Sequence, residues 1–170
     1  VRVQLLGQHP QWLAENAETA IELGSPGVDL NFGCPAKTVN KSKGGAVLLK
    51  ETQALYDIVK AVRDAVPSHI PVSAKIRLGF EDKSLAVDNA MAITEAGASE
   101  LVVHARTKTE GYKPPAYWEW IAKIKQHTSI PLVANGEIWS ASDAKRCQDE
   151  SHCTNLMVGR GALALPNLAL

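Results

Sequence analysis

A cysteine occupies a turn-forming segment of this 170-residue chain, where a thiol could do chemistry. Cys34 belongs to the sequence Asn31-Phe32-Gly33-Cys34-Pro35, and glycine and proline are typical of turns. Cysteines with a purely structural role are usually buried within apolar elements. Because thiols are mostly protonated at neutral pH, a thiol in such a loop can serve as a general acid as well as a nucleophile. The sequence favours a chemical role for Cys34, and a structural role stays open.

Three further polar side chains lie within or at the end of apolar segments. Lys75 and Arg77 are two residues apart and would share one face of a β-strand. An unpaired buried cation is costly, so Lys75 is predicted to face an anion, a cofactor or water. His104 ends another segment. Alone it would more often be a hydrogen-bonded core residue than a catalyst, and only its neighbours favour a role in chemistry.

Two short glycine motifs have the composition of an anion-binding site. In Asn135-Gly136-Glu137 and Gly159-Arg160-Gly161 the small residues would let backbone N–H groups approach an anion, and Arg160 adds a positive charge. Short glycine motifs are also common in ordinary strand-to-helix turns. Both interpretations stay open from these residues alone.

A lysine-rich segment follows Cys34 directly. Lys37, Lys41 and Lys43 lie in the stretch from Leu30 to Lys50, which contains no acidic residue. Such runs are usually solvated loops. Next to a reactive thiol, the charge also suits a polyanionic substrate such as RNA.

Six short apolar segments must position these side chains as β-strands. Helical patterns with a period near 3.6 residues separate them, and successive strands begin about 31 residues apart on average. The predicted strands are Arg2–Leu6, Gly27–Asn31, Pro71–Leu78, Glu100–His104, Pro131–Asn135 and Asn155–Gly159. This alternation predicts an α/β protein whose parallel strands are joined by right-handed crossovers.

An open doubly wound sheet and a (β/α)8 TIM barrel both fit this alternation. Every predicted strand carries polar residues within it or just past its carboxyl end. In the first strand this polar residue is Gln4. In a barrel all these ends meet at one mouth, whereas an open sheet presents only its switch point to a ligand. The pattern favours a barrel. If the two glycine motifs follow strands seven and eight, where barrels often bind phosphate, residues 1–170 form a partial barrel of strands three to eight.

The composition excludes several classes of protein. Eighteen basic and 18 acidic residues give no net charge, and 45% of residues are hydrophobic, unlike basic nucleic-acid coats or acidic disordered tails. No apolar run reaches the length of a membrane helix. Three cysteines are too few for a disulfide scaffold, which favours the reducing cytoplasm. Cys147, His152 and Cys153 offer only three nearby metal ligands and no Cys-x-x-Cys pair, so no metal site is expected.

Taken in order, these motifs resemble the tRNA-dihydrouridine synthase family of (β/α)8-barrel flavin enzymes. The resemblance spans essentially all 170 residues, from Val3–Gly7 through Asp29–Lys37 and Lys75–Gly79 to Val103–Thr107 and the two glycine motifs. Lys37-Thr38-Val39-Asn40 and Gly136-Glu137-Ile138-Trp139 are most similar to the bacterial C-type subfamily, the tRNA-dihydrouridine(16) synthases.

The resemblance implies reduction of a specific D-loop uridine of tRNA to 5,6-dihydrouridine, with FMN as cofactor and NADPH as reductant. Cys34 would donate the proton to C5 of the uracil. The implied flavin contacts are Gln4, Lys75 and His104, with Asn135, Gly136, Glu137, Gly159 and Arg160 around the phosphate. The implied substrate contacts are Asn31 and Arg77 on the uracil, and Lys37, Lys41 and Lys43 on tRNA phosphates.

The family pattern also includes segments that residues 1–170 do not contain. These are the first two β/α units and a C-terminal helical domain that grips tRNA. Whole family members are expected to be monomers, whereas this chain would expose unpaired edges at its first and last strands and could self-associate there. We expect weak FMN binding and little or no activity from the chain alone.

Two other functions fit part of the sequence. Another FMN-dependent barrel enzyme acting on a small molecule, such as a dihydroorotate dehydrogenase-like enzyme, would share the lysine and the phosphate site but would not need the lysine-rich segment. A non-catalytic RNA-binding remnant would retain RNA without flavin and would be indifferent to removal of the Cys34 thiol.

Overall fold

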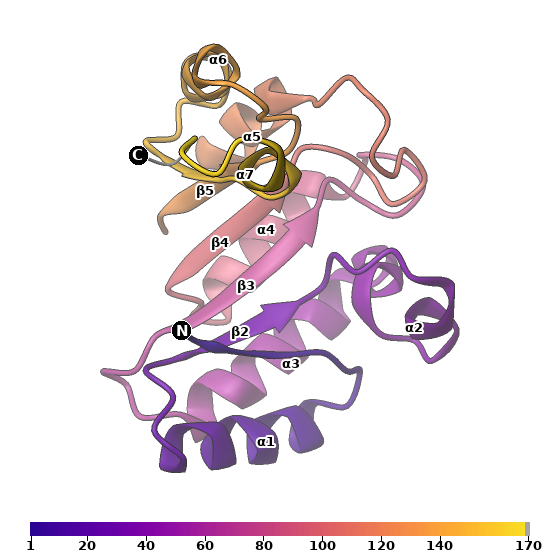
Figure 1. The fold of residues 1–170 in the computed structure, drawn as a ribbon. Helices are drawn as coiled ribbons and strands as arrows, with labels where there is room; N and C mark the ends of the chain where they lie inside the picture. The colour runs from indigo at the N-terminus through magenta and orange to yellow at the C-terminus, as the bar shows by residue number, and fades with distance from the viewer. Residues whose placement is uncertain (169–170) are drawn as a thin grey trace.

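A computed structural model describes residues 1–168, and in it six parallel β-strands form a single sheet (Figure 1). The strands are β1 Val3–Leu5, β2 Val28–Asn31, β3 Val72–Arg77, β4 Glu100–His104, β5 Leu132–Asn135 and β6 Asn155–Met157. All six predicted strands are confirmed, each within two residues at either end.

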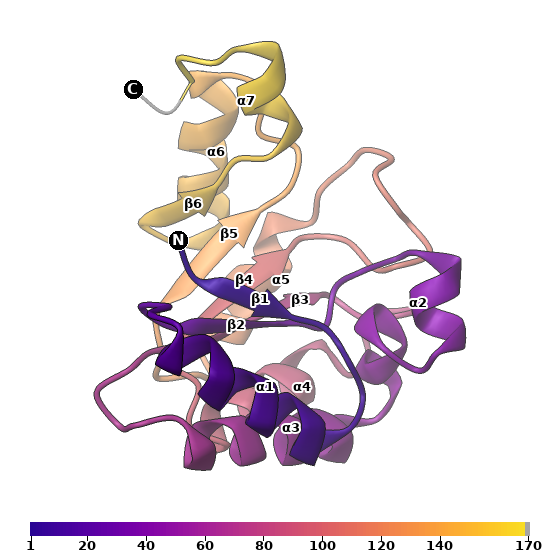
Figure 2. The ribbon, with the colours of Figure 1, turned by 60° about the horizontal axis from the view of Figure 1, so that its bottom comes forward.

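Five long helices connect successive strands and cover one face of the sheet (Figures 1 and 2). They are α1 Pro10–Glu22, α3 Thr52–Ala65, α4 Ala86–Glu95, α5 Trp118–Lys125 and α6 Ala141–Ser151. The short helix α2 Lys37–Lys41 and the 3-10 helix η1 Gly45–Lys50 lie between β2 and α3, and α7 Arg160–Ala164 follows β6. An apolar stripe fixes how each long helix packs: in α3, Leu55, Ile58 and Val62 are all buried. None of the helices within residues 1–168 is long and apolar enough to span a membrane.

Alternation along the strands gives the sheet one apolar face and one largely polar face, on which Val102 and Val133 are apolar members. In β3, Ala74 and Ile76 are completely buried in the main hydrophobic core. Ser73, Lys75 and Arg77 alternate with them and point to the opposite face. The hydrophobic core therefore lies between sheet and helices, and the polar face is left to build a site.

The strand order identifies the architecture. Consecutive strands are always neighbours, from β1 to β6, with no reversal, and the helices α1, α3, α4, α5 and α6 contact one another in the same sequence. A doubly wound sheet reverses its order at a switch point, whereas a barrel winds in one direction. The fold is a partial TIM-barrel arrangement. Within residues 1–168, β1 and β6 are the two unpaired edges.

Candidate active site

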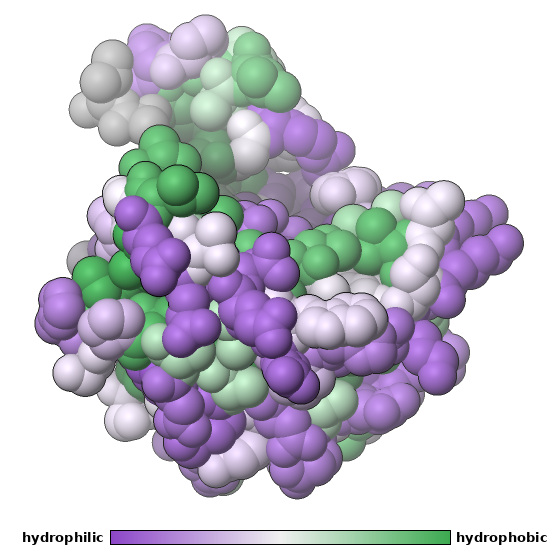
Figure 3. All heavy atoms as spheres, turned by 90° about the horizontal axis from the view of Figure 1, so that it is seen from below, coloured by the Kyte–Doolittle hydropathy of each residue, from purple (hydrophilic) through white to green (hydrophobic). Residues whose placement is uncertain are grey.

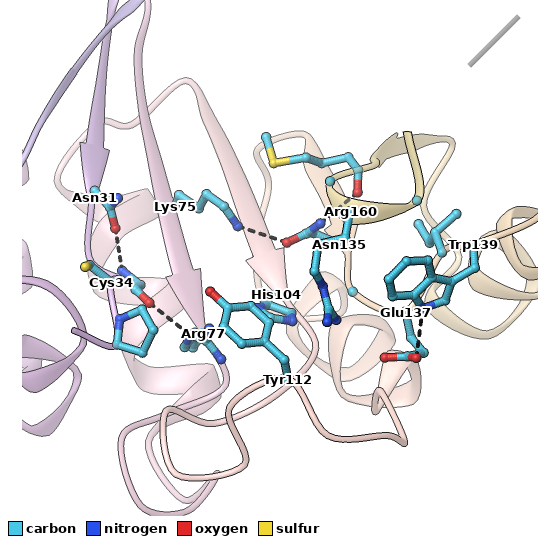
Figure 4. A pocket seen from close by; sticks show the side chains of 17 residues that line it. Asn31, Cys34, Lys75, Arg77, His104, Tyr112, Asn135, Glu137, Trp139 and Arg160 are labelled. Atoms are coloured by element: carbon cyan, nitrogen blue, oxygen red, sulfur yellow. Dashed lines mark hydrogen bonds between the residues drawn. The ribbon is translucent and has the colours of Figure 1, made fainter. Parts of the chain in front are cut away.

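A cavity of about 410 Å³ lies at the carboxyl ends of the strands. Ten of the predicted site residues line it: Asn31, Cys34, Lys75, Arg77, His104, Asn135, Gly136, Glu137, Gly159 and Arg160. Figure 4 shows Asn31 and Cys34 at one end of this cavity and Arg160 at the other, with the Lys75 amine between them. The structure thus brings together residues that lie up to 129 positions apart in the chain.

The backbone of Cys34 is held by contacts from the segment that follows it. Its carbonyl oxygen accepts a hydrogen bond from the Ala46 N–H at 3.0 Å and from Asn40 Nδ2 at 2.9 Å. Gly45 has a φ of 65°, and a Cβ there would lie 2.8 Å from the same oxygen. Only glycine accommodates both that backbone and that approach. These contacts keep the half-buried Cys34 at the wall of the cavity.

Arg77 links two loops at the wall of the cavity. It is only 2% exposed; its Nε donates to the Gly33 carbonyl at 2.9 Å, and its Nη1 donates to the carbonyls of Thr107 at 3.1 Å and Gly111 at 2.9 Å. Burial lowers the pKa of Arg77, and the adjacent Tyr112 phenol acts in the opposite direction. These bonds give Arg77 a structural function that the sequence did not reveal. Its contact with a uracil stays a prediction.

Lys75 supplies a positive charge near the middle of the cavity. Its Nζ donates to Asn135 Oδ1 at 3.0 Å, and Asn135 Nδ2 donates in turn to the Met157 carbonyl at 2.7 Å. Burial lowers the pKa of Lys75 to about 8, and the nearby Arg77 charge acts in the same direction. The amine is therefore mostly charged at neutral pH and has few partners from the protein, as expected of a group that meets an anion or a polar ligand.

His104 is a neutral imidazole in the cavity wall. The residue is 7% exposed, and burial together with the positive charges of Arg77 and Lys75 lowers its pKa to about 3. A neutral imidazole donates one hydrogen bond and accepts another. Gly136 packs directly on this ring, since a Cβ at that position would lie 2.8 Å from His104 Cδ2. The small residue thus brings the loop after β5 against the histidine.

The two glycine motifs lie side by side at one end of the cavity. A Cβ on Gly161 would overlap the Ile138 carbonyl oxygen, so glycine permits the loop after β6 to touch the loop after β5. In the described part of the chain, the backbone N–H groups of Gly136, Glu137, Arg160 and Gly161 donate to no protein acceptor. Four unused donors beside an arginine suit an anion such as a phosphate.

The carboxylate of Glu137 is already engaged. It accepts hydrogen bonds from Arg106 Nη2 and, at 2.9 Å, from Trp139 Nε1. Partial burial opposes ionisation, yet these two bonds hold the pKa of Glu137 below its usual range. A carboxylate would repel a phosphate, so the backbone N–H of Glu137, and not its side chain, is the group suited to an anion. The side chain instead shapes the loop.

Two aromatic residues of the cavity could not be assigned from the sequence. The Arg160 guanidinium lies 4.9 Å from the ring centroids of both Tyr112 and Trp139, within the range of cation–π attraction. Tyr112 comes from the loop between β4 and α5, which has no periodic pattern that could have placed it. Trp139 ends the motif Gly136-Glu137-Ile138-Trp139, but nothing in that motif indicates that its ring would contact Arg160.

Four predicted site residues lie outside the cavity wall. Gln4 accepts a hydrogen bond from Asn31 Nδ2 at 2.9 Å and donates to Asp29 Oδ2 at 2.6 Å, so it positions Asn31 from the neighbouring strand. Lys37, Lys41 and Lys43 lie on or next to α2, are exposed, and form no ion pair with any of residues 1–168. Their contacts with a substrate stay predictions.

The other two cysteines are core residues. Cys147 and Cys153 are both buried, and burial raises the pKa of each thiol, that of Cys147 to about 12. Among residues 1–168 no cluster of three or more potential ligands could hold a metal ion. Within this part of the chain, Cys34 is the cysteine placed for chemistry.

Comparison with known proteins identifies the family. The family model for dihydrouridine synthase (Dus) matches residues 1–170. The chain belongs to the dihydrouridine synthase family. It is 63% identical over 169 residues to the tRNA-dihydrouridine(16) synthase of Shewanella oneidensis, covering 99% of this chain and 54% of that protein. The corresponding enzyme of Pseudomonas putida is 57% identical over 170 residues, which are 100% of this chain and 53% of that relative.

The chain thus spans about half the length of the curated relatives that it matches. Solved structures support the fold independently of sequence. A crystal structure of TcOYE with pHBA has a TM-score of 0.63 at 19% identity, covering 92% of this chain and 46% of that one. The N-succinyl Arg/Lys racemase from Bacillus cereus has a TM-score of 0.65 at 14% identity, over 92% of this chain and 36% of its own.

Proposed function

We propose that this chain supplies the catalytic centre of an enzyme that reduces a specific D-loop uridine of tRNA to 5,6-dihydrouridine, with FMN as cofactor and NADPH as reductant. The observation that carries the proposal is the pairing of the Cys34 thiol at one end of the cavity with four unused N–H donors at the other. Names of relatives at 57–63% identity support the same reaction. The six strands would be strands three to eight of a barrel working in the cytoplasm.

The residues of the cavity fit FMN. The unused N–H groups around Gly136 and Gly161, with the Arg160 charge, suit its phosphate. Lys75 would stabilise negative charge on the reduced ring, and His104 offers a neutral donor and acceptor. When bound, FMN would supply a hydride to C6 of the uracil and be restored by NADPH, which becomes NADP⁺.

Cys34 would complete the reduction as a general acid. As C6 gains a hydride, the electron pair of the C5=C6 bond moves to C5, and the proton of the Cys34 S–H group is transferred there. The thiolate left behind regains a proton from water. Asn31, held by Gln4 at 2.9 Å, lies beside Cys34 and would hydrogen-bond the uracil edge. The target base must leave its stack to reach these groups.

A chimera tests the activity without depending on the length of this chain. The 170 residues would replace the matching segment of the Shewanella oneidensis enzyme, and dihydrouridine would be measured in an unmodified tRNA transcript. We expect the chimera to form dihydrouridine and its Cys34→Ala variant to lose most of this activity while NADPH still reduces its flavin. Cys153→Ala, which removes a buried thiol, is the matched control. Equal activity in the Cys34 and Cys153 variants would refute the role of Cys34.

Titration of the 170-residue chain with FMN tests the cofactor separately. We expect weak but saturable binding that Lys75→Met and Arg160→Met weaken further, whereas Lys145→Met, on an outer helix, leaves it unchanged. Retention of RNA without any flavin binding in the chimera would favour the RNA-binding remnant. Activity on a free pyrimidine and none on tRNA would favour the small-molecule flavin enzyme.

A further inference from the structure

A second hollow, of about 640 Å³, lies between α1 and α2. Its walls come from the loop after β1, the first turns of α1, and the segment Thr38–Gly44, and it shares no residue with the cavity described above. We call it the α1–α2 groove. Because β1 and β2 are parallel neighbours, the loops that follow them open at the same end of the sheet as Cys34. The cavity and the groove therefore lie at the same end of the sheet.

The floor of the groove is apolar and includes an exposed aromatic pair. Leu6 is 44% exposed and Trp12 is 62% exposed, so both add open apolar surface to the groove. The rings of His9 and Trp12 meet edge to face with centroids 4.4 Å apart. Trp12 is thus held by a neighbouring ring while much of its surface stays open, as in a platform on which a base can stack.

The rim of the groove is basic and carries hydrogen-bonding groups. Lys37 and Lys41 belong to α2, which supplies Thr38 to the wall, and Lys43 follows it directly, next to the wall residue Ser42. No carboxylate among residues 1–168 pairs with these three lysines. In Figure 3, apolar surface on the side where α2 lies is bordered by hydrophilic side chains that project outward. An occupant with a flat apolar group and a negative charge is complementary to this surface.

We propose that the α1–α2 groove binds an unstacked nucleotide of the tRNA, distinct from the uridine that is reduced, with its base on Trp12 and its phosphates at the lysines of α2. This inference rests on the proposed function, because it takes tRNA as the substrate. A peptide without acidic residues would satisfy the apolar floor but would leave the three unpaired lysines without a partner. A nucleotide satisfies both, since every base has a face that can stack and every linkage carries a charge.

Binding of an unmodified tRNA transcript by the chimera tests the proposal. Base stacking on an aromatic side chain predicts that Trp12→Ala raises the Kd for tRNA roughly tenfold, whereas Trp12→Phe retains most of the affinity. Leu23→Ala removes an 84% exposed side chain from the other end of α1, outside the groove, and should leave the Kd unchanged. A Kd of Trp12→Ala within twofold of the parent value, or an equal rise in Leu23→Ala, would overturn the proposal.

A salt titration tests the basic rim. Changing Lys37, Lys41 and Lys43 together to alanine should reduce the slope of log Kd against log salt concentration. The expected reduction is about 0.7–0.9 for each phosphate that the protein no longer neutralises. The control changes Lys60, Lys123 and Lys145, which lie on the outer helices α3, α5 and α6. Equal slopes in the two triple variants would contradict the proposal.

Crosslinking locates the nucleotide directly. A transcript that carries 4-thiouridine should crosslink to the peptide containing His9 and Trp12, and this crosslink should disappear in the triple lysine variant. Crosslinks confined to peptides of the Cys34 cavity would overturn the proposal. So would a Trp12→Ala protein that loses thermal stability but keeps its affinity for tRNA, because the groove would then be covered by another part of the chimera.

These outcomes are separate from those of the proposed reaction. If the proposal for the groove is wrong and the proposed reaction is right, Trp12→Ala keeps the KM for tRNA while Cys34→Ala stops dihydrouridine formation. If the reaction is wrong, no dihydrouridine forms in any variant, yet a weaker affinity of Trp12→Ala for tRNA still reports on the groove. The affinity for FMN should be the same in the parent and in Trp12→Ala.

Discussion

Arg106 donates a hydrogen bond from Nη2 to the carboxylate of Glu137, and this pair joins the loops that follow β4 and β5. The arginine side chain is completely buried, whereas that of Glu137 is 25% exposed. Arg106 Nε also donates to the Pro115 carbonyl at 3.0 Å, and its Nη1 finds no acceptor among residues 1–168. Glu137 itself has a φ of 56°, in the left-handed region. The charge of the buried arginine is therefore balanced by one carboxylate, and the residue that carries this carboxylate has an unfavourable backbone conformation.

Removing the two members of this pair should have unequal costs. Glu137→Ala leaves a buried guanidinium unpaired and is expected to lower the free energy of unfolding by about 3–5 kcal/mol. Arg106→Met leaves a carboxylate that water can reach, and should cost less. The double variant should be more stable than the sum of the single effects predicts. Urea denaturation of the ligand-free chain measures all three, and additive effects would show that the two side chains are not coupled.

The neutral state of His104 predicts a loss of stability in acid. Its pKa is about 3 in the folded chain, against an ordinary value of 6.5. Between these values the unfolded chain binds a proton that folded His104 does not, so stability falls as the pH drops from about 6.5 to 3, by at most about 1.4 kcal/mol per pH unit. His104→Asn should flatten this acid limb in denaturation experiments. His69→Asn, at an exposed position, should leave the limb as steep as in the parent.

The lowered pKa of Lys75 predicts a change in stability on the alkaline side of the pH profile. Burial lowers its pKa from 10.5 to about 8, so between these values the unfolded chain binds more protons than the folded chain. Its contribution to stability is then least favourable below pH 8 and improves as the pH rises to about 10.5. Compared with the parent, Lys75→Met should show a flatter dependence of stability on pH across this window. Lys41→Met, at an exposed position, should show no such flattening.

The fold could be predicted because its signals are local. Each strand is a short apolar run whose alternation also determines which side chains leave the core, as Lys75 and Arg77 do in β3. The carboxyl ends of parallel strands lie together whatever joins them, so polar residues at these ends could be assigned to one cavity. Cys34 and the two glycine motifs were located in this way, and they line the cavity as expected.

Pairings between distant side chains could not be predicted, because no local pattern encodes them. Arg77 is held by the carbonyls of Thr107 and Gly111, some 30 positions away, in a loop without periodicity. The carboxylate of Glu137 accepts a hydrogen bond from Arg106, a contact that nothing in the motif Asn135-Gly136-Glu137 indicates. Such contacts depend on how the strand-end loops meet in space. Sequence therefore located the cavity but not the full set of bonds that shape it.

Gly45 offers a test of how closely Cys34 must be positioned. Gly45 and Gly24 both have positive φ values, of 65° and 94°, so an alanine at either position strains the backbone. At Gly24 no atom lies within 4 Å of the added Cβ, whereas at Gly45 it would lie 2.8 Å from the Cys34 carbonyl oxygen. Gly45→Ala must therefore displace Cys34, and Gly24→Ala must not. A shift of about 1 Å in a reacting group can cost about a hundredfold in rate. We therefore expect dihydrouridine formation by the chimera to fall at least tenfold in Gly45→Ala and to stay near the parent level in Gly24→Ala.

The affinity for FMN serves as the control and should be equal in the two variants. Equal rates of dihydrouridine formation in both would show that the backbone contact at Gly45 does not position the thiol.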